Sequence, residues 1–147
     1  MTTLPTAPLL GLLLRLVYQQ WGNDVDAHLR AAGFDDIRAP HANVFAFVPP
    51  EGMQVTRLAR LARVRKQTMV QTVAELERAG YVERRPDPGD RRGRLVFLTE
   101  RGQAVRRLGV DAGRQVEEAW AGLTSSGEVE ALRSSLERLL DRLPGPA

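Results

Sequence analysis

Cysteine is absent from this 147-residue chain, histidine occurs twice, and aromatic residues make up 5% of the sequence. Without cysteine the chain has no disulfide, no thiolate zinc site and no thiol that could respond to oxidation. The histidines, His28 and His41, lie in different segments and do not form a metal-ligand pattern with each other. We therefore expect no metal site and no thiol-based switch.

Long apolar runs and catalytic motifs are also lacking. The apolar run at residues 9–18 contains Arg15 and is too short to span a bilayer. No positively charged stretch precedes it, so a secretory signal is not indicated and we expect a cytoplasmic protein. The sequence has no Gly-rich phosphate loop, no His/Cys nucleophile pair and no motif that places a serine beside a base. From these absences we expect that the protein is not an enzyme and binds no cofactor.

Positive charge is concentrated in the middle third of the chain. Residues 56–101 carry a net charge of +6, whereas residues 1–55 carry −2 and residues 102–147 carry −1. A confined excess of this kind is typical of a nucleic-acid-binding module. A solvated charged face has the same composition, so the positions of the charges must decide between the two.

Apolar spacing predicts a long helix and a short one before the basic third. Residues 9–31 have helical periodicity, and Gly33 ends that helix. A short helix is expected to begin at Pro40 and to stop at Pro49, because proline suits the first turn of a helix but not its interior.

Two further helices are predicted after the basic third. Thr99 is a candidate N-cap for a helix that extends to about residue 121. Ser125 and Glu128 have the spacing of a capping box before a last helix, which Pro144 ends. The apolar stripes of these helices are rich in leucine.

The basic third itself predicts two short helices separated by a tight break. The first covers residues 54–63, with Thr56 as a candidate cap, and the break lies at residues 63–65. The second covers residues 66–79 and is closed by Gly80. If its buried stripe is Met69, Val73 and Leu76, the face opposite that stripe includes Gln67 and Gln71.

A hairpin follows, and its tip carries a cluster of arginines. Strand-like segments at residues 81–85 and 94–98 flank a turn that contains Pro88 and Gly89. Arg91, Arg92 and Arg94 lie in and beside this turn. Like charges repel one another, so the cluster is better explained by a polyanion that binds there than by stability. The alternative is that these are ordinary solvated turn residues.

Two short helices, a tight break and a hairpin form a winged helix-turn-helix. In such a fold the second helix enters the major groove, and its leading residues reach the bases. Gln67 and Gln71 can pair with adenine, Thr68 can touch a thymine methyl group, and Arg65 and Lys66 suit phosphates. Gln67 and Gln71 could also be ordinary exposed helix residues.

The chain resembles the MarR family of transcriptional regulators (multiple-antibiotic-resistance regulator type). The resemblance is carried by the segments Asp-Pro-Gly-Asp-Arg-Arg-Gly-Arg at residues 87–94 and Leu-Thr-Glu-Arg-Gly at residues 98–102. The segment Leu-Glu-Arg-Ala-Gly-Tyr-Val-Glu-Arg at residues 76–84 precedes them. The helical flanks also agree, so the resemblance covers nearly the whole chain.

The resemblance implies one domain, residues 1–147, that is mainly α with a small β-hairpin. Residues 9–32 and 100–143 would form N- and C-terminal dimerisation helices, and residues 40–98 the winged helix-turn-helix. It also implies a homodimer that binds a pseudo-palindromic double-stranded DNA operator, usually as a repressor. In the wing, Arg92 would enter the minor groove, and Asp90 would orient it by a hydrogen bond.

The sequence departs from many relatives at the break between the two short helices. Arg63 stands where glycine is common, and Arg65 stands where serine or threonine is common. Glycine eases a left-handed turn, so we expect Arg63 to adopt another backbone geometry. Arg65 is expected to cap the second helix less well than a hydroxyl residue would.

A small-molecule effector is implied by the resemblance alone. Trp21, Phe45 and Trp120 are candidates to line its pocket, although aromatic residues at helical spacing are more often core. His41 could bind an anionic effector, or it could be a structural or surface histidine.

The sequence therefore predicts a homodimeric, sequence-specific DNA-binding regulator, with the leucine-rich ends buried between two copies. A non-specific architectural DNA-binding protein and a winged-helix module for protein interaction remain alternatives. The candidate DNA-binding residues are Arg65, Lys66, Gln67, Thr68, Gln71, Asp90, Arg91, Arg92 and Arg94, and the candidate pocket residues are Trp21, His41, Phe45 and Trp120.

Overall fold

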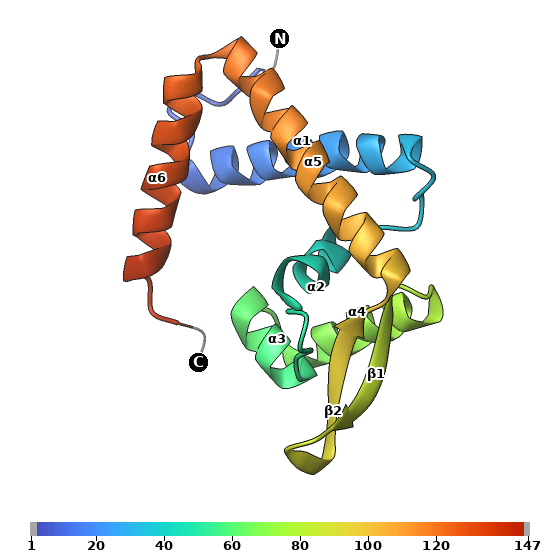
Figure 1. The fold of residues 1–147 in the computed structure, drawn as a ribbon. Coiled ribbons are helices and arrows are strands. Elements are labelled where there is room, and N and C mark those ends of the chain that lie inside the picture. The colour runs from blue at the N-terminus through green and yellow to red at the C-terminus, as the bar shows by residue number, and fades with distance from the viewer. Residues whose placement is uncertain (1–2, 146–147) are drawn as a thin grey trace.

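The computed structural model describes residues 3–145, and within them it contains six α-helices, one short 3-10 helix and one β-hairpin (Figure 1). This confirms the predicted mainly-α fold with a small hairpin. In chain order the elements are α1 (Leu10–Ala31), η1 (Ala39–His41), α2 (Ala42–Phe47), α3 (Val55–Ala62), α4 (Lys66–Arg78), β1 (Val82–Asp87), β2 (Asp90–Leu98), α5 (Glu100–Leu123) and α6 (Ser126–Arg142). None of these helices is both long and apolar enough to cross a membrane.

Side-chain caps fix the starts of the last two helices, as the sequence predicts. The Thr99 hydroxyl accepts a hydrogen bond from the Gly102 N–H at 3.1 Å. The Ser125 hydroxyl accepts one from the Glu128 N–H at 3.1 Å and donates to the Glu128 carboxylate at 3.0 Å. The two bonds from N–H groups satisfy backbone donors that the first turn of each helix leaves unpaired. The predicted cap at Thr56 is wrong, because α3 already begins at Val55.

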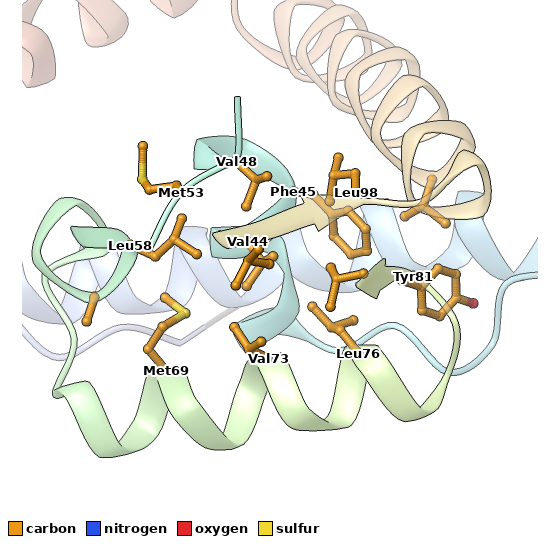
Figure 2. Close-up of a cluster of buried hydrophobic side chains, with 14 residues drawn as sticks. Val44, Phe45, Val48, Met53, Leu58, Met69, Val73, Leu76, Tyr81 and Leu98 are labelled. Carbon is orange, nitrogen blue, oxygen red and sulfur yellow. The ribbon is translucent and has the colours of Figure 1, made fainter. Parts of the chain in front are cut away.

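A single apolar cluster holds α2, α3, α4 and the hairpin together (Figure 2). Met69, Val73 and Leu76 project from α4 into this cluster, which confirms the predicted buried stripe. Leu58 of α3 and Val44 of α2 meet them and are fully buried. Because one face of α4 is anchored in this way, the opposite face has a defined position relative to the hairpin.

The hairpin is longer than the sequence predicts. Its antiparallel strands pair from Val82 opposite Leu98 to Asp87 opposite Asp90, with one irregularity beside Pro86. The expected strand limits, residues 81–85 and 94–98, are therefore wrong. Pairing continues past the core because the tight turn at Pro88 and Gly89 lets the polar ends of both strands keep their backbone hydrogen bonds.

The three long helices lie on the other side of the molecule from the hairpin tip (Figure 1). Helix α5 crosses α1, where Trp21 and Trp120 meet edge to face with ring centroids 5.7 Å apart. Helix α6 packs on α5, and the Arg133 guanidinium lies 2.5 Å from the Glu117 carboxylate. No residue of α6 is buried.

Helix α5 is also attached directly to the winged helix-turn-helix. Arg106 donates from Nε to the Phe45 carbonyl at 2.7 Å and from Nη2 to the Val48 carbonyl, and burial lowers the pKa of Arg106. Gly102 lies against the start of β1, because a Cβ atom there would sit 2.1 Å from the Tyr81 carbonyl oxygen. The start of α5 therefore fixes the position of the hairpin.

Candidate nucleic-acid interface

The outward face of α4 presents a group of polar side chains at its N-terminal end. Lys66, Gln67, Thr68 and Gln71 are all exposed. They lie on the helix surface away from the core stripe, where the sequence predicts them. Arg65 precedes the helix in extended backbone and makes no side-chain cap, as expected. A helix face of this kind can approach base edges without losing core contacts.

The break between α3 and α4 differs in backbone geometry from the sequence-based prediction. Arg63 adopts the left-handed conformation, with φ 56° and ψ 40°, so the expectation of another backbone geometry is wrong. The turn closes through the Val64 N–H, which donates to the Ala59 carbonyl at 3.0 Å. A left-handed conformation costs a residue with a side chain about 1 kcal/mol. The cluster that positions α3 against α4 evidently outweighs this cost.

The wing places three guanidinium groups at the tip of the hairpin. The sequence predicts Arg91 and Arg92 in the turn, but both are exposed residues of β2, as is Arg94. Among the described residues, no hydrogen bond joins Asp90 to the Arg92 guanidinium, so the predicted orientation of Arg92 by Asp90 stays a prediction. The Asp90 carboxylate instead accepts a hydrogen bond from the Arg92 backbone N–H at 3.0 Å. Asp90 thus shapes the wing backbone.

The wing is tied to the start of α3 by residues that the sequence analysis missed. Gln54 donates from its side-chain amide to the Asp87 carboxylate at 2.9 Å, and the other oxygen of Asp87 accepts the Gly89 N–H. The backbones of Met53 and Val96 also exchange two hydrogen bonds. Gln54 and Asp87 are 33 residues apart, and no sequence spacing reports such a pair.

A second missed cluster joins the end of α4 to the start of α5. The Arg101 guanidinium lies 4.3 Å from the Tyr81 ring centroid and donates to the Ala79 carbonyl at 2.6 Å. The Tyr81 hydroxyl donates to the Asp36 carboxylate at 2.5 Å. Burial, helped by the hydrogen bond to Asp36, raises the pKa of Tyr81 to about 12. The motif at residues 98–102 contains Arg101 and was the available signal for this cluster.

Two further arginines lie on the exposed side of α3. Arg57 and Arg60 are exposed. In helix-turn-helix proteins the first helix crosses the phosphate backbone, so Arg57 and Arg60 are further candidates for phosphate contacts. In the sequence, the only signal for Arg57 and Arg60 is the charge excess of the middle third.

The four candidate pocket residues lie in three different places. Trp21 and Trp120 form the edge-to-face pair between α1 and α5. Phe45 is 7% exposed and packs on Tyr81 in the core. His41 is 5% exposed, accepts the Arg38 N–H at Nδ1 and lies 2.9 Å from Glu75. Both ring nitrogens of His41 therefore have partners within the protein.

An open cavity of about 760 Å³ lies next to Trp120. Its lining is mostly apolar and comes from α1, the end of α5 and the start of α6, and includes Leu13, Val17 and Leu132. Trp21, His41 and Phe45 are not among its lining residues. Within residues 3–145, no group of three or more His, Asp or Glu side chains could hold a metal ion.

Residues 36–93, which include the two short helices and most of the wing, match the model of the MarR family. The winged helix-turn-helix of this chain is therefore of the MarR type. The chain is 28% identical to the transcriptional regulator HosA of Escherichia coli over 107 residues. These residues make up 72% of this chain and 79% of HosA. The chain is 33% identical over 84 residues to the HTH-type transcriptional repressor NicR of Pseudomonas putida, 57% of this chain and 53% of NicR.

Solved MarR structures share the fold over nearly the whole chain. A mutant MarR from E. coli in complex with operator DNA matches with a TM-score of 0.75 and 26% identity, over 89% of this chain and 93% of that one. The chain thus has the winged-helix fold of the MarR proteins, with terminal helices.

Proposed function

We propose that this MarR-family protein is a homodimer that binds a pseudo-palindromic DNA operator in a sequence-specific manner and represses transcription. The observation that carries the proposal is the fixed arrangement of the polar face of α4 beside the arginine-bearing wing. The MarR structure with operator DNA supports the same use of the fold. The relative NicR, a repressor, supports the direction of control.

The residues have different roles in this proposal. Arg65, Lys66, Arg91, Arg92 and Arg94 neutralise phosphates and supply most of the affinity. The α4 side chains Gln67, Thr68 and Gln71 contact base edges and so discriminate between DNA sequences. Asp90 contributes through the shape of the wing.

Dimerisation is proposed from the leucines that one copy leaves exposed. The leucines of α6 and of its C-cap are between 37% and 53% exposed: Leu132, Leu136, Leu139, Leu140 and Leu143. On α1, Leu10, Leu14 and Val17 are also exposed. A second copy would cover these stripes and bring two copies of α4 to one side of the dimer. The half-sites would then lie roughly 10 bp apart.

The proposal includes release of the DNA by a small-molecule effector. This part depends on the family, and the cavity beside Trp120 is one space that such a molecule could occupy. An effector would act by binding one spacing of the two α4 helices more tightly than another.

A gel-shift assay against the DNA upstream of the chain's own gene, with random DNA as competitor, tests the proposal. Retention that resists competitor is the expected result. Retention that competitor removes completely favours a non-specific architectural protein. No retention at any concentration favours a protein-interaction module.

A further inference from the structure

A line of four polar groups runs from the η1 turn to the DNA-facing side of α4. The Arg38 backbone N–H donates to His41 Nδ1 at 3.0 Å, and His41 Nε2 lies 2.9 Å from Glu75 Oε2. The other oxygen of Glu75 accepts a hydrogen bond from the Gln71 side-chain amide at 3.4 Å. The line therefore connects the segment after α1 to a side chain that is proposed to contact bases.

The first bond of the line determines the state of the histidine. Because Nδ1 accepts the Arg38 N–H, the ring proton of neutral His41 lies on Nε2. Nε2 then donates to Glu75, and this hydrogen bond lowers the pKa of Glu75. The carboxylate is ionised and acts as an acceptor at both oxygens. His41 is 5% exposed, so its ring position is fixed by packing.

The last bond of the line restricts the Gln71 amide. A glutamine amide has one acceptor oxygen and two N–H donors, and three rotatable bonds let it turn over freely. With one N–H bound to Glu75, the oxygen and the second N–H remain for a base edge. These two groups are the pair that recognises the amino group and N7 of adenine.

We propose that His41 and Glu75 are positioning residues that orient the Gln71 amide toward DNA. They would set the base preference of Gln71 without touching DNA themselves. This inference rests on the proposed function, because it requires Gln71 to contact a base.

Two substitutions at His41 separate orientation from a structural role. In His41→Asn the shorter amide can still accept the Arg38 N–H, but it cannot reach Glu75. In His41→Gln the longer amide reaches Glu75 with an N–H, but it no longer accepts the Arg38 N–H. A structural role would be damaged by the second change at least as much as by the first.

The experiment selects binding sites for the full-length protein from a duplex pool of randomised sequence. Gln71→Ala first identifies the base pair whose preference depends on Gln71. We expect His41→Asn to reduce the preference at that base pair roughly fivefold or more, with other positions and affinity for random DNA unchanged. His41→Gln should keep the preference of the parent.

A second pair of variants removes one negative charge from α4, at Glu75 as the test and at Glu77 as the control. Glu75→Gln keeps the length of the side chain but removes one of its two acceptor oxygens, so the preference at the same base pair should fall. Glu77, whose carboxylate pairs with Arg84 at 3.5 Å, makes no contact with Gln71 among the bonds of the described residues. Glu77→Gln should therefore change affinity for all sequences alike.

The outcomes distinguish this inference from the proposed function. If the parent protein selects no sequence, the proposed function fails. If it selects one and Gln71→Ala changes no position, or His41→Asn keeps the parent preference, the inference is overturned and the regulator remains. Equal loss in His41→Asn and His41→Gln also overturns it, since that result indicates a structural role.

Discussion

At the scale of single residues, the wing uses its carboxylates and its guanidinium groups differently. Asp87 and Asp90 accept backbone N–H groups and so hold the shape of the tip. Among residues 3–145, no hydrogen bond or ion pair involves the Arg92 guanidinium. The sequence predicted the positive tip correctly. The hydrogen bond from the Arg92 backbone N–H to Asp90 was not predicted, because sequence spacing does not distinguish a backbone donor from a side-chain donor.

The Arg92 guanidinium is expected to bind the phosphate-rich minor groove. Arg92→Ala should weaken operator binding, and the slope of log affinity against log salt concentration should fall by about 0.9. Fluorescence anisotropy at several salt concentrations measures both. Arg30→Ala, at the far end of α1, removes the same charge and should change neither. An Arg92→Ala variant with the affinity and salt slope of the parent would show that the wing does not bind DNA.

Arg63 has a left-handed backbone conformation, which is unfavourable for a residue with a Cβ atom. Because Arg63 has φ 56°, replacement by glycine should relieve the left-handed strain. We expect Arg63→Gly to raise the free energy of unfolding by roughly 0.5–1 kcal/mol, measured by urea denaturation. Arg60→Gly, three residues earlier within α3, should lower it by about 1 kcal/mol. A loss of stability in both variants would contradict the strain argument.

At the scale of elements, the sequence predicted what is local and missed what is distant. Thr99 and Ser125 cap helices through neighbours three residues away, so their spacing was informative. The bond between Tyr81 and Asp36 joins residues 45 apart, and the bond between Gln54 and Asp87 joins residues 33 apart. Such pairs depend on how the helices pack, which no window of sequence contains.

The Tyr81 cluster predicts a loss of stability at high pH. The pKa of Tyr81 is about 12 in the folded chain, against an ordinary value of 10. Its contribution to stability is therefore complete below pH 10 and is lost as the pH rises from about 10 to about 12. Urea denaturation across this range should show a falling free energy of unfolding. In Tyr81→Phe the fall should be smaller, and an identical fall would mean that another group causes it.

At the scale of the whole molecule, the winged helix-turn-helix has a well-packed core, whereas the long helices at the other end leave apolar side chains exposed. The winged helix-turn-helix surrounds a buried cluster, whereas α6 has no buried residue and carries a stripe of exposed leucines. The same stripe could be recognised in the sequence as an apolar helix face. What the sequence could not give is the direction in which the stripe points, since that depends on how α6 packs against α5.

The proposed dimer makes the leucine stripe of α6 essential for operator binding. Leu136→Glu would place two carboxylates, one per copy, in a two-fold interface, and should weaken dimerisation by roughly 3 kcal/mol or more. Size-exclusion chromatography with light scattering should then report a monomer, and affinity for the two-half-site operator should fall with it. Arg138→Glu puts the same carboxylate two residues away on the opposite face of α6 and should leave the dimer intact. If Leu136→Glu remains a dimer, the copies associate through another surface. If it becomes a monomer that binds the operator with undiminished affinity, the two-half-site model is wrong, because one copy of α4 and one wing would then account for all of the binding.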